Sequence, residues 1–191
     1  MSATNRGGKR VVNDRYFTPH WLTEAILPHI GERLSDNRPL KILEPAFGDG
    51  HIVAPLKSYL DVCGFAHDVS VIDITPPINI DFLTHDFGNT RFDLIITNPP
   101  YSLAMEFVEK SMEIRRDKNS IVCMLLRIGF LGSKKRATWL RANTPSVYIT
   151  PKRPSFVNGG NDNCEYGWFI WQDSWEGQNL HFLKTDHIKG R

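Results

Sequence analysis

The residues best suited to chemistry are Asn98, Pro99, Pro100 and Tyr101, which directly follow the apolar run Phe92–Thr97. This run predicts a buried strand, and the two prolines end it because neither has a backbone N–H. Open α/β sheets bind ligands at the carboxyl ends of their strands. There the Asn98 side-chain oxygen could accept a hydrogen bond from an amino group, and Tyr101 could stack on a planar base. The tetrapeptide therefore suits an enzyme that modifies an exocyclic or amide nitrogen, and the alternative is a plain Asn-Pro turn.

A second candidate site is the turn from Glu44 to Gly50, which contains two glycines and follows a predicted short strand. Glycines allow a ligand to approach the backbone closely. The acids Glu44 and Asp49 disfavour a phosphate, which such loops bind through backbone N–H groups, and the ending of a Walker A motif is absent. Asp73 lies 23 residues after Gly50, a spacing at which a carboxylate binds ribose hydroxyls. A ligand with a ribose and a positive centre fits S-adenosylmethionine.

The overall composition is that of one compact globular domain. The chain has 191 residues, of which 41% are hydrophobic and 23% charged, an ordinary balance for a soluble protein. No apolar run reaches the roughly 18 residues that span a bilayer, and the polar start is unlike a signal peptide, so we expect no membrane partner. Cys63, Cys123 and Cys164 have neither metal-ligand nor disulfide spacing, which predicts no metal site and a cytoplasmic location.

Strands and helices alternate along the chain after a polar, basic segment, residues 1–14, that we expect to be a flexible arm. Thr18 is the predicted N-cap of the first helix, with Pro19 at its first position. Periodicity predicts helices at residues 21–34, 51–60, 103–116 and 133–142, and strands at residues 40–43, 69–73, 78–83, 92–97, 121–126, 147–150 and 166–171. The pattern implies an α/β fold, a doubly wound, mostly parallel sheet of about seven strands covered on both sides.

Positive charge is unevenly distributed, although the net charge is only +2. No Asp or Glu occurs from Lys118 to Asn161, and this stretch contains Lys118, Arg127, Lys134, Lys135, Arg136, Arg141, Lys152 and Arg153. Such asymmetry is typical of a face that binds a polyanion. The alternative is a set of solvated surface charges.

The order of these motifs resembles that of the S-adenosylmethionine-dependent N6-adenine DNA methyltransferases, in the gamma arrangement common among phage and restriction-associated enzymes. The motifs are Phe17–Pro19, Glu44–Gly50, Asp73, Asp81–Leu83, Asn98–Tyr101 and Pro151–Phe156. The resemblance extends over about residues 15–171 and implies a Rossmann-like methyltransferase domain at 15–191, with S-adenosylmethionine as its cofactor and DNA as its partner.

The resemblance also implies roles for individual residues. The catalytic set is Asn98, Pro99, Pro100 and Tyr101. The cofactor-binding set is Phe17, Thr18, Pro19, Glu44, Pro45, Ala46, Phe47, Gly48, Gly50, Asp73, Ile74, Asp81, Phe82 and Asn98. The substrate-binding set is Tyr101 and Phe156 for the base and Lys134, Lys135, Arg136, Lys152 and Arg153 for the nucleic acid.

In the implied mechanism, the Asn98 side-chain oxygen and the Pro99 backbone oxygen accept the two N–H bonds of the target amino group. Tyr101 and Phe156 enclose a base that has flipped out of its duplex. The sequence departs from the family at Phe47, where a smaller residue is common. It also has only about 35 residues after Phe156, so we expect no separate target-recognition domain. Sequence specificity would then be short, weak or supplied by a partner, and a specificity partner or a homo-oligomer is possible.

Several alternatives stay open from the residues alone. Phe156 could anchor its loop in the core, Asp86 competes with Asp81 for the adenine contact, and Thr18 could serve only as a helix cap. The same Asn-Pro-Pro-Tyr chemistry could act on adenine in RNA or on the side-chain amide of a glutamine in a protein. A non-catalytic subunit that keeps the fold is the last alternative, and the intact tetrapeptide argues against it.

Overall fold

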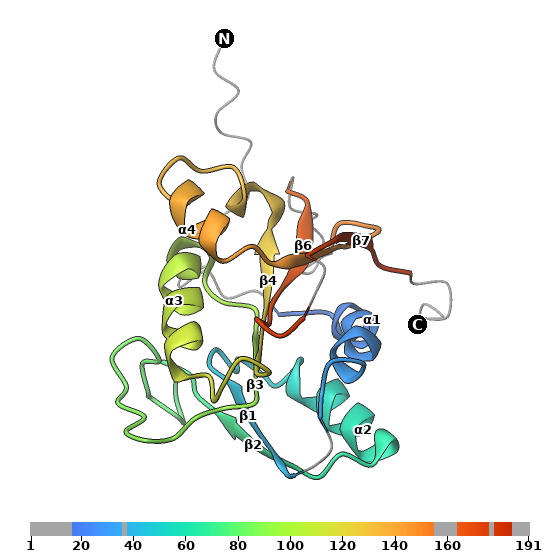
Figure 1. The fold of residues 1–191 in the computed structure, drawn as a ribbon. Helices are drawn as coiled ribbons and strands as arrows, with labels where there is room; N and C mark the ends of the chain where they lie inside the picture. Colours follow the sequence, from blue (N-terminus) through green and yellow to red (C-terminus); the bar gives the residue numbers. More distant parts are fainter. Residues whose placement is uncertain (1–16, 36–37, 155–163, 176–177, 185–191) are drawn as a thin grey trace.

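The computed structural model describes residues 17–35, 38–154, 164–175 and 178–184, so the predicted arm 1–14 lies outside the described residues. The helices are α1 (His20–Gly31), α2 (Val53–Cys63), α3 (Ala104–Ile114) and α4 (Ala137–Ala142), with short 3-10 turns η2 (Tyr101–Leu103) and η3 (Ile128–Phe130). The strands are β1 (Leu40–Glu44), β2 (His67–Val71), β3 (Leu94–Thr97), β4 (Ile121–Arg127), β5 (Ser146–Ile149), β6 (Tyr166–Trp171) and β7 (Leu180–Phe182). Figure 1 shows their arrangement.

The strands of the described residues form one sheet of seven, in the order β2-β1-β3-β4-β6-β5-β7. Strand β6 runs antiparallel to both its neighbours, and every other pairing is parallel. The chain therefore winds outward from β1 in two directions, first to β2 and then to β3. This confirms the predicted doubly wound, mostly parallel sheet of about seven strands.

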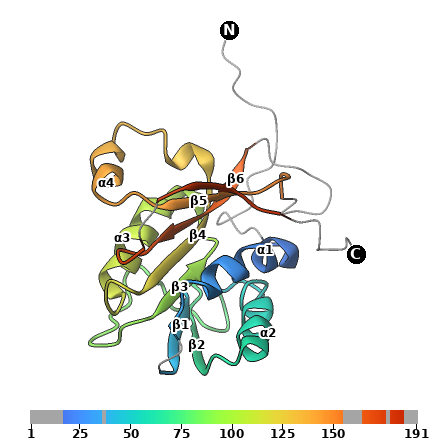
Figure 2. The ribbon, with the colours of Figure 1, turned by 45° about the vertical axis from the view of Figure 1, so that its right-hand side comes forward.

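Helices cover both faces of the sheet, and Figures 1 and 2 show α1 and α2 on one side with α3 and α4 on the other. Because successive strand residues point to opposite faces, β4 contributes to two hydrophobic cores. Ile121, Cys123 and Leu125 pack with α1 and α2, whereas Val122, Met124 and Leu126 pack with α3 and α4. All six are fully buried, which is the pattern of a central strand.

The predicted strand at residues 78–83 is wrong, because this segment forms irregular turns. Pro76 and Pro77 have no N–H to offer a ladder, Asn79 has a positive φ of 53°, and the Ile80 N–H bonds back to the Asp73 carbonyl at 2.8 Å. Strand β7 was missed, since its short polar-flanked sequence has no clear pattern. Strand β7 is thus the edge strand at the opposite end of the sheet from β2.

Two helix starts also differ from the prediction. The N-cap of α1 is Pro19 rather than Thr18, and no side chain caps the helix. The reason is that the Thr18 hydroxyl bonds instead to Asn98. Helix α4 begins only at Ala137, so the basic residues 134–136 lie in the turn before it.

Candidate active site at the carboxyl edge of the sheet

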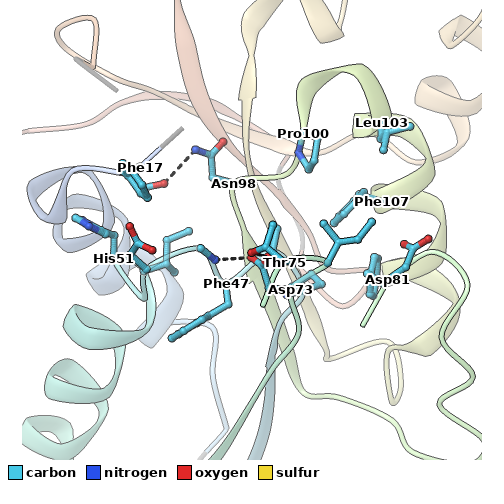
Figure 3. Close-up of a pocket in the computed structure, with 18 of the residues that line it drawn as sticks. Phe17, Phe47, His51, Asp73, Thr75, Asp81, Asn98, Pro100, Leu103 and Phe107 are labelled. Carbon is cyan, nitrogen blue, oxygen red and sulfur yellow. Dashed lines mark hydrogen bonds between the residues drawn. The ribbon is translucent and has the colours of Figure 1, made fainter. Parts of the chain in front are cut away.

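A cavity of about 640 Å³ lies where β1, β2 and β3 end, a size typical of small-molecule sites. Eleven of the fourteen residues predicted to bind a cofactor line it: Phe17, Thr18, Pro45, Ala46, Phe47, Gly48, Asp73, Ile74, Asp81, Phe82 and Asn98. The other three, Pro19, Glu44 and Gly50, do not line it. Figure 3 shows that the labelled side chains converge from the glycine loop on one side and from Asn98, Pro100 and α3 on the other.

Asn98 follows the last residue of β3, and its side-chain amide is hydrogen-bonded at the cavity wall. Its Nδ2 donates a hydrogen bond to Thr18 Oγ1 at 3.1 Å, and Figure 3 shows the amide oxygen turned away from this bond. The side chain also lies close to the Tyr101 hydroxyl. Thr18 is 3% exposed, so the amide is bound to a buried partner at the cavity wall.

The glycine loop is attached to the end of β2 through Asp73. The Gly48 N–H donates to Asp73 Oδ2 at 2.7 Å, and both the backbone N–H and the hydroxyl of Thr75 donate to Oδ1. Gly48 and Gly50 have φ values of 56° and 80°, in the left-handed region that glycine occupies without strain. A Cβ at Gly50 would also come within 3.0 Å of the Phe47 ring. The loop therefore requires a glycine at position 50.

Glu44 lies beneath this loop and is only 1% exposed. Its Oε1 accepts the Ala46 N–H at 3.1 Å, which holds the first turn of the loop. Burial raises the pKa of Glu44 to about 8, because the charged form is poorly solvated there. At neutral pH the carboxyl group is mostly protonated, and it stabilises the loop rather than lining the cavity.

The opposite wall is the turn at Asp81–Leu83, which α3 holds in place. Asp81 Oδ1 accepts the Leu83 N–H at 2.9 Å. From α3, Lys110 Nζ donates to the carbonyls of Leu83 and His85 at 2.8 and 2.7 Å, and it lies 5.7 Å from the Phe82 ring centre. Lys110 thus ties the helix that follows the tetrapeptide to the wall containing Asp81. No pattern in the sequence indicates this role.

The charge of the cavity is negative. Its lining includes the carboxylates of Asp49, Asp73 and Asp81, and no Lys or Arg belongs to the lining that the structure describes. The remaining surface is largely apolar, and Ile74, which is 62% exposed, is part of it. This donor and acceptor set fits a ligand with a positive centre, hydroxyl groups and a flat apolar part, and it disfavours a polyphosphate.

Other lining residues were missed from the sequence. At the mouth, His51 stacks on Phe17 at a centroid distance of 5.4 Å. At the far end, Leu103 and Phe107 both line the cavity, and they are four residues apart, the spacing that puts side chains on one helix face. Their spacing directly after the tetrapeptide is the feature of the sequence that could have predicted both as lining residues.

Tyr101 does not line the cavity. Its ring packs against Tyr166 at a centroid distance of 5.4 Å, and the Arg127 guanidinium lies 4.9 Å from its centre. The Arg127 Nε in turn donates to the Tyr166 hydroxyl at 3.2 Å. Burial raises the pKa of Tyr101 well above its ordinary value. The stacking role of Tyr101 stays a prediction, and Phe156 lies outside the described residues.

The basic residues predicted to bind nucleic acid have different surroundings. Lys134 and Lys135 are exposed in the turn before α4. Arg136 instead donates to the Phe130 carbonyl at 2.8 Å. Lys152 Nζ lies 4.8 Å from the centre of the Trp21 ring, and Arg153 pairs with Glu165 at 2.6 Å. Of the five, Lys134 and Lys135 are thus the two that project from an exposed turn, and phosphate binding by all five stays a prediction.

In the ranges that the structure describes, no group of three or more His, Cys, Asp or Glu side chains could hold a metal ion. The helices in those ranges are also too short or too polar to cross a bilayer.

No family model matches the chain, whereas solved structures are similar to it in fold. One, assigned as a class I S-adenosylmethionine-dependent methyltransferase from Listeria monocytogenes, has a TM-score of 0.70 and 13% identity, over 90% of this chain and 66% of its own. The type I restriction-modification system methyltransferase subunit from Streptococcus thermophilus has a TM-score of 0.65 and 17% identity, over 87% and 47%. The plantazolicin methyltransferase BpumL, crystallised with S-adenosylhomocysteine, has a TM-score of 0.53 and 11% identity, over 80% and 83%.

These similarities define the class of fold. The chain has the α/β fold of class I S-adenosylmethionine-dependent methyltransferases, in a single sheet. It spans 66% and 47% of the length of the first two structures.

Glu44 makes stability depend on pH. Because its folded-state pKa of about 8 exceeds the ordinary value of 4.5, the folded protein binds an extra proton between these values, and the free energy of unfolding falls as pH rises. Glu44→Gln should remove that part of the slope, up to about 4 kcal/mol between pH 5 and pH 8. Urea unfolding of both proteins across this range measures it, with the exposed Glu106→Gln as control. Parallel curves for wild type and Glu44→Gln would contradict the assignment.

Lys110 should limit the mobility of the cavity wall that contains the Asp81–Leu83 turn. Lys110→Met keeps the length of the side chain but removes both hydrogen bonds to the carbonyls of Leu83 and His85, at a cost of about 1–3 kcal/mol. We expect faster hydrogen–deuterium exchange across residues 83–90 and unchanged exchange in β4. Glu109→Gln, exposed on the same helix, is the control. Unchanged exchange in Lys110→Met would show that the wall is held by other contacts.

Proposed function

We propose that the protein transfers a methyl group from S-adenosylmethionine to the N6 amino group of adenine in DNA. The observation that carries the proposal is the position of Asn98, from the sequence Asn-Pro-Pro-Tyr, at the rim of an acidic cavity whose described lining contains no Lys or Arg. The class of fold supports the cofactor. The tetrapeptide supports the amino group as the acceptor.

The residues of the cavity fit the parts of S-adenosylmethionine. Asp73 offers a carboxylate to ribose hydroxyls, and Asp81, Phe82 and Ile74 offer a polar edge and apolar faces to the adenine. The negative charge of the cavity favours a sulfonium ion, and backbone groups of the glycine loop suit the amino acid portion. The cofactor supplies an electrophilic methyl group on this sulfonium.

The protein must make the target nitrogen nucleophilic, because its lone pair is conjugated into the ring. Asn98 Oδ1 and the Pro99 carbonyl are two acceptors on one rigid loop. Accepting both N–H bonds draws the nitrogen toward a tetrahedral geometry and stabilises the positive charge that develops on it. Holding the nitrogen in line with the methyl group is a positioning effect. The two prolines restrict the backbone of this loop, so the Pro99 carbonyl is held in place before the substrate binds.

The nucleic acid would approach the same edge of the sheet. The turn with Lys134 and Lys135 follows β4, and Lys152 follows β5, both strands that run parallel to β3. Phosphate contacts from these side chains would be independent of sequence. A base in a duplex must flip out to reach Asn98, and stacking on an aromatic ring returns about 1–3 kcal/mol.

One assay tests the proposal and its alternatives. The protein is incubated with S-adenosylmethionine labelled in the methyl group and with unmethylated duplex DNA, single-stranded DNA, RNA or a protein extract. We expect label on DNA, recovered after digestion as N6-methyladenine. Label on RNA alone or on protein alone would overturn the DNA assignment, and no transfer to any substrate would favour a non-catalytic subunit.

Asn98→Ala should lower the rate of transfer at least about 100-fold, the range for loss of a preorganised charge-stabilising group. Binding of S-adenosylmethionine, measured by calorimetry, should change little. Asn119→Ala, exposed at the opposite edge of the sheet, is the control. Near-normal transfer by Asn98→Ala would refute the assigned role.

Lys134 and Lys135 should contribute to the salt dependence of DNA binding. We expect Lys134→Gln with Lys135→Gln to weaken binding and to reduce the slope of log K against log salt by up to about 2. The matched control is Lys57→Gln with Lys118→Gln, which removes the same charge from exposed lysines away from the cavity. Equal slopes for the two double variants would show that the DNA-binding face lies elsewhere.

A further inference from the structure

The hydroxyl of Thr18 joins the two halves of the candidate site. It accepts the hydrogen bond from Asn98 Nδ2 at 3.1 Å across 80 positions of sequence, and both residues line the same cavity. Figure 3 shows this bond as a dashed line that runs from Asn98 to the start of α1. A residue before the first helix therefore fixes the side chain that follows the third strand.

Thr18 itself has a rigid support. Helix α1 begins directly after Pro19, and its first turn closes with the Leu22 N–H donating to the Pro19 carbonyl at 3.0 Å. The Trp168 Nε1 donates to the Leu22 carbonyl at 2.9 Å and so ties this turn to β6. Leu22 and Trp168 are fully buried. The distance between Thr18 and Asn98 is thus set by the core.

A count of hydrogen bonds shows which further bond the Thr18 hydroxyl can make. A threonine hydroxyl has one hydrogen to donate and two lone pairs to accept with. Asn98 uses one lone pair. In the described part of the chain, no acceptor takes the hydroxyl hydrogen of Thr18. Because Thr18 lines the cavity, this hydrogen is available to water or to a ligand that replaces it there.

We propose that Thr18 is a positioning residue that couples cofactor binding to the orientation of the Asn98 amide. This inference rests on the proposed function. The amino acid portion of S-adenosylmethionine contains a carboxylate, which can only accept hydrogen bonds. Once the Thr18 hydrogen is donated to it, Thr18 can offer Asn98 only a lone pair, so Nδ2 must face Thr18.

The opposite orientation of the amide is then excluded. With Oδ1 toward Thr18, the amide would need the same hydroxyl hydrogen, and two acceptors would compete for one donor. The bound cofactor therefore keeps Oδ1 turned away from Thr18, where it can accept an N–H bond from the target. Since coupling between two sites is reciprocal, occupancy of the base site also strengthens cofactor binding.

The Asn98 side-chain amide can be followed directly by NMR, in a measurement that needs no substrate. Its NH₂ resonances are identified by their loss in Asn98→Asp. Addition of S-adenosylhomocysteine should slow their hydrogen exchange by about five- to tenfold in wild type, the effect of one added hydrogen bond. Thr18→Ser keeps the hydroxyl and should respond in the same way, whereas the isosteric Thr18→Val should show no slowing. Thr138→Val, exposed on α4, is the control for the substitution itself.

Kinetics provide the second measurement. At saturating S-adenosylmethionine, Thr18→Val should have a kcat about tenfold lower, and Thr18→Ser should recover most of it. Calorimetry distinguishes a failure of the proposed function from a failure of this inference alone. If S-adenosylhomocysteine does not bind wild type, the proposed function fails and the inference with it. If it binds while the Asn98 amide is unchanged, or changes equally in Thr18→Val, the inference alone is overturned.

Discussion

The site depends on the parallel pairing of β1 with two neighbours. Strand β1 pairs with β2 on one side and with β3 on the other, so the chain changes direction at this strand. The loops that leave β1 and β3 must then diverge to opposite faces of the sheet, which opens a crevice at their carboxyl ends. The glycine loop lines one side of this crevice, and Asn98 and Pro100 of the tetrapeptide line another. Neither motif could make a cavity alone, and the distance between them is set by β1 and β3, whose side chains are all buried except that of Lys41.

Much of this could be predicted from sequence, because it follows from short-range chemistry. Apolar runs ended by Pro or Gly gave the central strands, and their order gave the edge at which Asn98 and Asp73 meet. The predictions that failed concern residues whose contacts lie far away in the sequence. Thr18 was predicted to cap α1, since nothing local shows that Asn98 lies beside it. Glu44 was predicted to contact the ligand, whereas burial makes it a support for the loop. The roles of Lys110 and Arg127 depend on contacts between helix, strand and loop that no local pattern encodes.

The inside of the cavity and the protein surface beyond β4 differ in charge, and this difference affects which ligand each can bind. Inside are three carboxylates without a cation in the described lining, and outside, beyond β4, are exposed lysines. A phosphate backbone is attracted to the outer surface and repelled by the interior, while a cationic cofactor is favoured inside. Under the proposed function, this separation lets two ligands of opposite charge occupy adjacent sites without competing for the same groups.

The two halves of the site also differ in rigidity. In the cofactor half, the glycine loop is held by backbone N–H groups and short side chains, such as Asp73 and Thr75, that bond to one another. The base half contains long planar side chains, since Arg127 and Tyr166 both contact the Tyr101 ring. Under the proposed function, a base that stacks on Tyr101 must replace contacts that Arg127 and Tyr166 now make with this ring. Under the proposed function, the cofactor therefore enters a preformed site, and the base enters one that rearranges around it.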